Sequence, residues 1–499
     1  MIKHIRIKNN STVSLWDIPL LNYEDLLEQS ISLLQDESCH CVNYFGYPHR
    51  DQLILICCIA NDREHLITIS SSVINFNSVL PSFTHHHLAF HLFEREIHEN
   101  FGIKYSDHPW LKPVRYPFSR ADKNSRIENY PFYAIESEEV HEVGVGPIHA
   151  GIIEPGHFRF ICDGEQILHL EIQLGYQHRG TEQLFLKKNN LLQRTHFAES
   201  IAGDTVAGHT TAFVNLWESL CNYDAEDHLQ FSRTLALELE RIAIHTGDLS
   251  ALCTDIAYQL GSAVFGRLRT PVINYFQRWC GNRLGKGLIR AGKNNYPFTK
   301  QLGDPLKRLF DEYERDFIEM YDEFKTLPSV LARLEKTGTV TKEQAASIGT
   351  VGMAAKMSGI PRDIRVSHPH DWYERMNHEP VIKHYGDVYS RTQIRKEEIL
   401  QSIEIIRNMI KSIPPENKKR KELSFPAPDL FGISLVEGWR GEICHCAITG
   451  ENGNLVHYKV KDPSFHNWLA LALAVRNNEI SDFPVCNKSF NLSYCGHDL

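Results

Sequence analysis

The chain of 499 residues is too long for one ordinary domain, so two or three domains are expected. Hydrophobic residues make up 42% of it and charged residues 23%, a globular composition that excludes a largely disordered chain. With 53 Lys and Arg against 62 Asp and Glu, the formal net charge of −9 excludes a net basic field that would attract nucleic acid or anionic lipid.

An α+β domain is predicted over residues 1–118. Apolar residues recur at helical spacing over residues 23–37, which predicts an amphipathic helix. Short apolar runs follow at residues 53–59 and 65–69, and runs of this length are typical of strands. The chain is therefore expected to open with a helix followed by strands.

A second helix is expected over residues 85–100, ending at Gly102, because glycine suits the left-handed position that follows a helix. Histidines gather at its start, and His87 and His91 lie four residues apart on one helix face. No carboxylate at suitable spacing accompanies them. A solvated helix face is therefore favoured over a metal site.

A linker is predicted over residues 119–143, within a stretch rich in Pro, Arg, Glu and Ser that has no sustained periodicity. A mainly α-helical second domain with small β-sheets is predicted over residues 144–499, with a strand pair at about 158–174. Residues 442–460 alternate in hydrophobicity around Glu-Asn-Gly-Asn, the chemistry of a tight hairpin turn. The long helices of this domain are expected through residues 190–221, 224–252 and 304–334.

Neither a membrane span nor a metal-binding cysteine set is evident in the sequence. No run approaches the roughly 20 apolar residues that cross a bilayer, and residues 1–20 lack the apolar region of a signal peptide, so we expect a cytoplasmic chain. The 12 cysteines form no C-x-x-C pair. We therefore expect buried free thiols, and no zinc or iron–sulfur site held by this chain alone.

Residues 93–111, FEREIHENFGIKYSDHPWL, read physically as a helix end, a glycine stop and a His-Pro turn. The segment resembles the E-R-E-x-x-D-x-F-G-I and H-P-x-L motifs of the small subunit that partners the quinone-site subunit in respiratory complex I. Glu99 stands where that pattern has Asp, a mild departure. The resemblance implies a complex I small peripheral-arm type of domain over residues 1–118.

Two loops rich in glycine and histidine flank the predicted strand pair: VGVGPIHAGIIEPGHFRF at residues 143–160 and LGYQHRGTEQLF at residues 174–185. Glycine lets the backbone approach another body closely, so a lined cleft and ordinary loops are about equally supported by the residues alone. Both segments resemble the start of the large subunit of group 4 membrane-bound hydrogenases, where G-P-x-H and E-P-G-H-F border the active-site cavity. The resemblance favours the cleft.

The segment ESIAGDTVAGHTT at residues 199–211 resembles the R-V-C-G-I-C-x-x-x-H motif of NiFe hydrogenases, and KDPSFHNW at residues 461–468 resembles D-P-C-x-x-C. Ser200 replaces the arginine, and His209 is retained. Nickel and iron in such a site are held by soft thiolate sulfur, so the chain is not expected to hold a nickel–iron centre. The cysteine positions are taken by Ala202, Thr205, Ser464 and Asn467.

The resemblance continues collinearly through residues 235–249, the patch GTVGMAAKMSGIPRDIR, the segment GDVYSR and the motif VEGWRGE, so that it spans residues 93–499. The chain is similar to the family of group 4 NiFe hydrogenase large subunits and complex I quinone-site subunits. Within that family it resembles the metal-free component G type of hydrogenase-4-like and formate-hydrogenlyase-like complexes. The implied fold is an α+β domain followed by a hydrogenase-large-subunit-like, mainly α-helical domain.

Site roles also follow from the resemblance. Arg440 and Asp462 match the arginine and aspartate that lie over the metal in hydrogenases, and we expect them to form an ion pair, because an unpaired buried charge is costly. Glu154 matches the proton-relay glutamate, and His149 matches the complex I histidine that hydrogen-bonds quinone. Together with His209, these residues are expected to border a polar, hydrated pocket. Gly203 stands where complex I places a quinone-binding tyrosine, which counts against a quinone site.

The residues Glu238, Arg241, His245 and Asp248 form a single polar stripe on one predicted helix. Charges so spaced support one another. An exposed, salt-bridged stripe is one interpretation, and a cavity wall or charged partner interface is the other, with about equal support.

The resemblance implies a peripheral subunit on the cytoplasmic side of the inner membrane of a prokaryote. The implied partners are an iron–sulfur small subunit, a ferredoxin-like subunit and integral membrane antiporter-like subunits, with no nucleic acid. No cofactor bound by this chain is expected, quinone is an acceptor that the resemblance allows, and the iron–sulfur cluster would lie in a partner subunit.

Two functions remain open. In the first, the chain is an oxidoreductase subunit, similar to those of NADH:quinone oxidoreductase, that passes electrons to quinone or another acceptor with coupling to ion translocation. In the second, it is a non-catalytic scaffold that links peripheral and membrane arms. An open, polar cavity beside His149 would favour the first and bulky apolar filling the second. Active nickel–iron hydrogenase is excluded by the missing thiolates.

Overall fold

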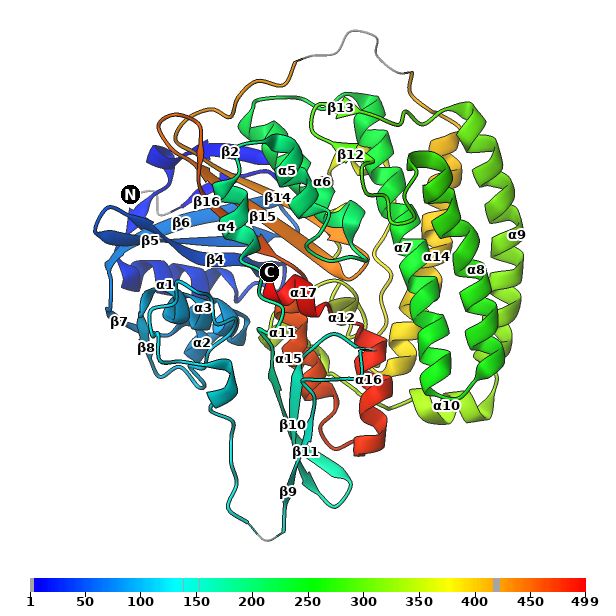
Figure 1. Cartoon of the computed structure of the whole chain (residues 1–499), viewed down its shortest axis with the longest axis horizontal. Coiled ribbons are helices and arrows are strands. Elements are labelled where there is room, and N and C mark those ends of the chain that lie inside the picture. The colour runs from blue at the N-terminus through cyan, green and yellow to red at the C-terminus, as the bar shows by residue number, and fades with distance from the viewer. Residues whose placement is uncertain (1–3, 138, 152, 416–421) are drawn as a thin grey trace.

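The structure is a computed structural model that describes residues 4–137, 139–151, 153–415 and 422–499. Figure 1 shows sheets and short helices on one side of the molecule, a bundle of long helices on the other, and a narrow three-stranded sheet that projects between them. The predicted class, an α+β region followed by a mainly helical region with small sheets, is confirmed.

The N-terminal sheet has five strands in the order β1-β6-β5-β4, with β3 (Leu20–Leu21) parallel to β6. The strands predicted at residues 53–59 and 65–69 are confirmed within β5 (Gln52–Asn61) and β6 (Leu66–Asn75). The sequence did not predict β4 (Cys39–His49), because Cys, His, Asn and Gly interrupt its apolar pattern although most of it is buried. β1 (Ile5–Ile7) completes the sheet.

Helices α1 (Tyr23–Leu33) and α3 (His91–Phe101) cover one face of this sheet (Figure 1). α1 is shorter than predicted, whereas α3 ends at Gly102 as expected, with a left-handed φ of 73°. The expected helix over residues 85–100 is divided, because α2 (Phe83–His86) and a 3₁₀ turn precede α3. His85 and His86 are exposed but His91 is buried, so the expected solvated face is only partly correct.

The N-terminal segment contributes a strand to a sheet built from the C-terminal segment. β2 (Ser11–Ser14) pairs antiparallel with β14 (Leu430–Gly438), at the edge of a four-stranded sheet of order β16-β15-β14-β2. β15 (Gly441–Thr449) and β16 (Leu455–Lys461) form the predicted hairpin, and Gly453 takes a positive φ of 73° in its turn. The two sheets share one apolar core, so the chain's two ends are packed together.

Long helices form the other side of the molecule (Figure 1): α7 (Asp227–Asp255), α8 (Gln259–Cys280), α9 (Lys300–Phe324) and α14 (Val388–Ile410). The helix predicted at residues 224–252 is confirmed as α7. The helix predicted at 190–221 is two helices, α5 (Leu191–Ala198) and α6 (Val206–Leu220), and the one at 304–334 is α9 followed by α10 (Pro328–Leu334). The break between α5 and α6 falls within the motif that resembles the first cysteine pair.

The projecting sheet has the order β11-β10-β9, formed by β9 (His141–Val145), β10 (His157–Asp163) and β11 (Gln166–Gln173). The predicted strand pair is β10 and β11, and β9 lies at the end of the stretch predicted as a linker. Residues 146–156, which connect β9 to β10, include Ile152, which is outside the described residues. No helix in the described ranges is long and apolar enough to cross a membrane.

The remaining elements are short. They are β7 (Val79–Pro81), β8 (Lys104–Ser106), α4 (Thr181–Lys187), β12 (Ile289–Arg290), β13 (Lys293–Asn294), α11 (Lys342–Ser347), α12 (Met353–Lys356), α13 (Ile364–Ser367), α15 (Ser464–Ala474), α16 (Phe483–Phe490) and α17 (Tyr494–Asp498), with 3₁₀ turns at Leu15–Asp17, Leu88–Phe90, Ile127–Asn129, Asp371–Arg375 and Ile480–Asp482. All the cysteines are free thiols, and only Cys495 is not fully buried, which agrees with the expectation from the sequence.

Candidate functional site

The positions that resemble the cysteine ligands lie at the starts of α6 and α15, and their polar atoms are already engaged. Thr205 Oγ1 accepts a hydrogen bond from Arg440 at 3.1 Å, and Ser464 Oγ accepts one from the backbone of Ser493 at 2.8 Å. The amide of Asn467 is paired with the backbone N–H and carbonyl of Val351, both at 3.1 Å. Ala202 offers no ligand atom. A donor set without sulfur does not fit nickel and iron.

Arg440 occupies the centre of this region, and the partner expected for it is wrong. Its two terminal nitrogens bind the carboxylate of Asp204 at 2.7 and 2.6 Å. The guanidinium also lies over the ring of Trp439, 4.0 Å from its centroid. Asp462 makes no hydrogen bond to it, although its charge, with that of Asp204, helps to raise the pKa of Arg440 against the effect of burial. The sequence did not predict Asp204 as the partner of Arg440. Asp204 lies two positions after Ala202, in a loop whose course only the fold determines.

Asp462 belongs to a buried chain of acid–base groups. Its Oδ2 lies 3.0 Å from His209 Nε2, and His209 Nδ1 lies 3.1 Å from His445 Nε2. His445 Nδ1 lies 2.7 Å from the hydroxyl of Tyr458. The chain is self-consistent when Tyr458, His445 and His209 each donate toward an ionised Asp462.

The electrostatics of this chain agree with that assignment. Burial opposes ionisation of Asp462, but the hydrogen bond and charge of His209, with Arg440 nearby, lower its pKa to about 2. Burial and the neighbouring His209 hold the pKa of His445 well below its ordinary value, so His445 is neutral near pH 7. A carboxylate, two imidazoles and a phenol that are joined by hydrogen bonds in one chain form a path along which a proton can be relayed.

His149 and Glu154 lie apart from this chain, in the connection between β9 and β10. His149 is partly buried, donates from Nε2 to the carbonyl of Gly156 at 2.8 Å, and packs against Phe158. Glu154 is exposed and lies beside Cys495, where burial first and the glutamate second raise the pKa of the thiol to about 11. In the described ranges, neither forms a hydrogen bond or ion pair with Arg440, His209 or Asp462.

The pocket expected among these residues is not open. Arg440, His209 and Asp462 are buried, and they line none of the described cavities. The surface nearest to them is the loop at residues 203–204: Gly203 is exposed, and a Cβ built there would meet nothing within 4 Å. The side chain of Asp204 is 36% exposed. Solvent therefore reaches Asp204 but not the chain behind it.

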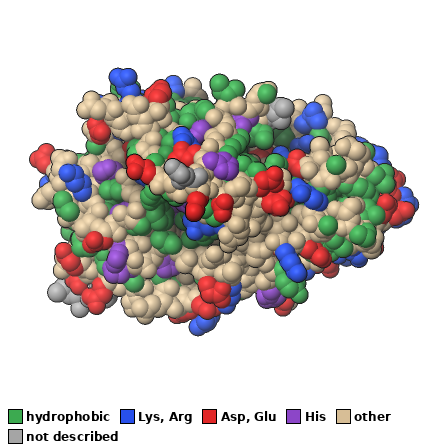
Figure 2. All heavy atoms as spheres, turned by 90° about the horizontal axis from the view of Figure 1, so that it is seen from below, with side chains coloured by type: hydrophobic (Ala, Val, Ile, Leu, Met, Phe, Trp, Pro, Cys, Tyr) green, Lys and Arg blue, Asp and Glu red, His purple; other side chains and the backbone are tan. Residues whose placement is uncertain are grey.

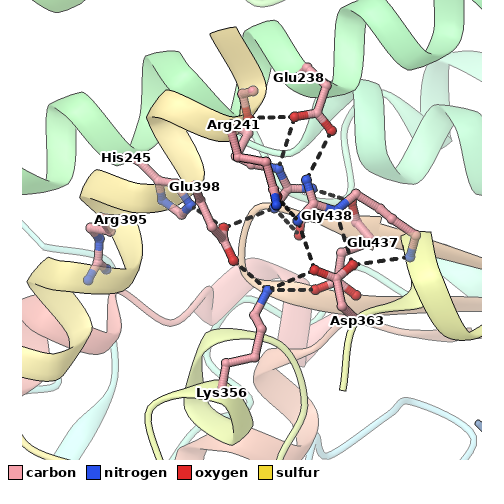
Figure 3. A network of polar contacts seen from close by, with 12 residues as sticks. Glu238, Arg241, His245, Lys356, Asp363, Arg395, Glu398, Glu437 and Gly438 are labelled. Atoms are coloured by element: carbon pink, nitrogen blue, oxygen red, sulfur yellow. Dashed lines mark hydrogen bonds and ion pairs between the residues drawn. The ribbon is translucent and has the colours of Figure 1, made fainter. Parts of the chain in front are cut away.

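The polar stripe on α7 is buried, so its interpretation as an exposed stripe is wrong. Figure 3 shows Glu238, Arg241 and His245 of α7 facing charged groups of α12, α14 and β14. The exposed-stripe interpretation failed because amphipathic spacing cannot tell water from a charged neighbour. The fully buried members of this charged network are Glu238, Arg241, His245, Lys356, Asp363, Arg365, Glu398 and Glu437.

Glu398 and Lys356 connect the members of the charged network on α7 to those on the other elements. Glu398 accepts from His245 at 2.8 Å and from Arg241 at 3.3 Å, and it binds Lys356. The ammonium of Lys356 also lies 3.3 Å from Asp363 and 3.4 Å from Glu437. Each positive group thus has at least one carboxylate, which is how buried charges are tolerated.

Glu437 is the member of the network that can change charge near neutral pH. Burial and the carboxylate of Asp363 raise its pKa to about 7, against the opposing charges of Lys356 and Arg241. The fourth residue of the stripe, Asp248, binds Arg395 at 3.0 Å and the amide of Asn491 at 2.7 Å. Because the Asn491 carbonyl accepts from Arg440, Asp248 is linked through Asn491 to the region around Arg440.

Lys356, Glu398 and Glu437 were not singled out from the sequence. Lys356 lies within the apolar patch GMAAKMSGI, and a lysine there is a signal that a buried partner exists. Glu437 lies in the motif VEGWRGE, where the resemblance drew attention to Arg440 instead. No cluster of three or more His, Cys, Asp or Glu side chains in the described ranges is placed to hold a metal ion.

Comparisons with known proteins match two separate parts of the chain to different families. Residues 23–120 match the family described as respiratory-chain NADH dehydrogenase, 30 Kd subunit. Residues 259–430 match the family described as respiratory-chain NADH dehydrogenase, 49 Kd subunit. The first range covers α1 to α3 and strands β4 to β6 of the N-terminal sheet, and the second covers most of the helical bundle.

Curated relatives span both kinds of complex. Hydrogenase-4 component G of Escherichia coli (strain K12) is 26% identical over 387 residues, 78% of this chain and 67% of the relative. Membrane-bound hydrogenase subunit alpha of Pyrococcus furiosus is 28% identical over 374 residues, 70% of this chain and 85% of the relative. The C/D subunit of the NADH-quinone oxidoreductase of Phocaeicola vulgatus is 26% identical over 418 residues, 77% of this chain and 79% of the relative.

Proposed function

We propose that this chain, which joins domains of the 30 Kd and 49 Kd subunit types of respiratory-chain NADH dehydrogenase, delivers electrons and protons to quinone or another acceptor. The premise is that it is an oxidoreductase subunit of a membrane-associated complex. The electrons come from an iron–sulfur cluster in a partner subunit. No nickel–iron chemistry takes part, because the positions that resemble its ligands hold Ala202, Thr205, Ser464 and Asn467.

The observation that carries this proposal is the hydrogen-bonded chain from Tyr458 through His445 and His209 to Asp462. Reducing a quinone to a quinol consumes two electrons and two protons, so an acceptor site needs titratable groups within reach. The chain supplies such groups beside Arg440, at the place where the family resemblance locates the active centre. The Arg440 and Asp204 pair would orient the acceptor's polar end and supply hydrogen-bond donors to it.

The acceptor would approach at the loop of residues 203–204, where the structure has free space and an exposed carboxylate. Gly203 provides no phenol there, so the hydrogen bonds to the acceptor must come from Arg440 and from the connection that carries His149 and Glu154. An iron–sulfur small subunit would complete the site by covering this surface. A ferredoxin-like subunit and membrane antiporter-like subunits complete the proposed complex, which lies on the cytoplasmic side of the membrane and couples electron transfer to ion translocation.

The test uses the intact complex and measures quinone reduction. Replacement of His149 by Ala or of Glu154 by Gln should lower turnover at least several-fold while the same set of subunits assembles. The matched control is Asp163→Asn, which removes an exposed carboxylate from the same three-stranded sheet and should leave turnover unchanged. Unchanged turnover in both site variants, with assembly intact, would contradict the proposal.

A second function, a non-catalytic scaffold between the peripheral and membrane arms, is favoured by one observation. The centre of the site is filled by the Arg440 side chain, paired with Asp204 and stacked on Trp439, rather than left open. Gly203→Tyr distinguishes the two functions, because the open space at Gly203 accepts a side chain without a clash. An acceptor site at this loop predicts a changed KM for quinone, whereas a scaffold predicts no change in any kinetic constant.

A further inference from the structure

A cavity distinct from the region around Arg440 lies where the N-terminal domain meets the second domain. Its volume is about 280 Å³, and its walls come from α3, from the extended stretch after it, from β11 and from α15. Tyr133 at its rim is 45% exposed, so the cavity is accessible from solvent. Junctions between domains are frequent places for small-molecule sites.

The walls of this junction cavity are suited to a flat ring. Trp110, Tyr130 and Trp468 line it together with the aliphatic side chains of Leu170 and Ile172. Aromatic groups prefer offset or edge-to-face contacts with other rings, which these walls offer from several directions. The volume limits the occupant to a small molecule, because drug-sized pockets begin at about 300 Å³.

Two buried polar atoms in these walls have no partner. The indole nitrogen of Trp468, a side chain only 4% exposed, donates to nothing among the described residues. His91, only 6% exposed, likewise has an unpaired Nδ1. Each of these two atoms has almost no accessible surface, so it lies within the wall, and an occupant of the cavity would have to bind through other groups.

The charges around the cavity are unbalanced. Arg95 is buried and donates to the carbonyls of Lys112 and Pro113, and no carboxylate in the described ranges lies within salt-bridge distance of it. Arg476 meets the ring of His169 and likewise pairs with no described carboxylate. The single acidic residue in the walls, Glu171, is already paired with Lys112. The cavity therefore carries excess positive charge.

We propose that this cavity binds a small planar aromatic carboxylate. The ring lies among Trp110, Tyr130 and Trp468, and the carboxylate faces Arg476 and Arg95. Binding here would tie the two domains together, because the walls come from both. The proposal is independent of the acceptor site near Arg440, since no residue named here belongs to it.

The test is a calorimetric titration of the full-length chain with 2-naphthoate, and with the neutral 2-naphthamide for comparison. One molecule of 2-naphthoate should bind per chain, with the amide at least several-fold weaker. Arg95→Met removes the buried positive charge from the wall, and should weaken naphthoate binding about tenfold while leaving naphthamide unchanged, as expected for a contact with a charged group. Arg278→Met, at an exposed arginine outside this cavity, is the matched control and should have no effect.

A second variant keeps the test decisive if Arg95→Met disturbs folding. Arg476→Met removes one positive charge at the rim of the cavity and should weaken naphthoate several-fold while leaving naphthamide unchanged. Absence of saturable naphthoate binding, or affinity unaffected by both variants, would overturn the proposal. Tighter, competitive binding of the neutral short-chain quinone ubiquinone-1 would also overturn it, by showing that the cavity prefers an uncharged ring.

Discussion

Burial of charge governs the residues around Arg440. The side chain of Arg440 is 4% exposed, and a buried guanidinium is tolerated only when a carboxylate and good hydrogen bonds compensate for lost water. Asp204 supplies both, while Asp462 is committed to His209. The two carboxylates therefore have different partners although both lie near the same arginine.

Double-mutant cycles should reveal this division. The coupling free energy between Arg440→Gln and Asp204→Asn is expected to be about 2 kcal/mol, because the groups are in direct contact. The coupling between Arg440→Gln and Asp462→Asn should be less than half of that, since no hydrogen bond joins them. Denaturant unfolding of the four single and double variants with the parent chain measures both. A larger coupling free energy with Asp462→Asn than with Asp204→Asn would show that Asp462 is the partner of Arg440.

Glu437 predicts a pH dependence of stability. Its carboxyl has a pKa of about 7 in the folded chain, whereas an unfolded glutamate titrates near 4.5. Between these two pH values Glu437 keeps a proton in the folded state that it has lost in the unfolded state. The stability that this proton contributes is therefore full below about pH 4.5 and is lost as the pH rises through 7. Glu437→Gln stays neutral, so from pH 5 to 8 its stability should improve relative to the parent by on the order of 1–3 kcal/mol.

The measurement is urea unfolding followed by tryptophan fluorescence at low protein concentration, at several pH values. Glu374→Gln is the control, because Glu374 is exposed in the same half of the molecule. It should leave the pH profile of the free energy of unfolding unchanged. A constant difference between Glu437→Gln and the parent chain across this pH range would contradict the raised pKa.

At the scale of elements, two glycine-bearing turns bring distant segments together around Arg440. Gly352, which precedes α12, has a φ of +59°, and a Cβ there would lie 2.2 Å from the Cα of Gly441 in β15. The backbone of α12 can approach the start of β15 only because neither residue has a side chain. This approach positions Lys356 of α12 inside the charged network.

Gly352→Ala should therefore destabilise the chain by about 3 kcal/mol or more, because it adds both a backbone clash and a left-handed strain. Gly203→Ala is the matched control: nothing lies within 4 Å of its Cβ, so its effect should stay within about 0.5 kcal/mol. The measurement is the free energy of unfolding of each variant, compared with that of the parent chain. Equal, small effects would mean that the backbones at Gly352 and Gly441 are not in close contact.

On the scale of the whole molecule, the two domain types interlock rather than sit side by side. β2 pairs with β14, and Glu96 of α3 binds Arg115 at 3.0 Å and Lys459 of β16. Phe93 packs on Phe465 across the same junction, with ring centroids 5.0 Å apart. On the face seen in Figure 2, hydrophobic and histidine side chains are exposed between charged ones.

Glu96→Ala should lower the stability of the entire chain, not only of its N-terminal part. Removal of this buried carboxylate leaves Lys459 without its closest partner, at a cost of about 3 kcal/mol. Glu37→Ala, which removes an exposed carboxylate that meets Lys342 across the same junction, should cost about 0.5 kcal/mol or less. Unfolding monitored by fluorescence and by circular dichroism should show one coincident transition. Two separate transitions would mean that the domains fold independently.

The sequence by itself determined the features that depend on local pattern. Periodicity predicted α7, turn chemistry predicted the β15–β16 hairpin, and a glycine at the right offset predicted the end of α3 at Gly102. The replacement of the motif cysteines was visible too, because it requires only residue types at known spacing. These features involve residues a few positions apart, for which short-range geometry is decisive.

Only the tertiary structure decided which distant groups meet. The pairing of Arg440 with Asp204, the burial of the α7 stripe against Lys356 and Glu398, and the entry of β2 into the C-terminal sheet each join segments far apart in sequence. The same holds for the junction cavity, whose walls come from both domains. Periodicity shows that a helix face is polar, but not whether water or another buried charge will face it, because that depends on the packing of the complete chain.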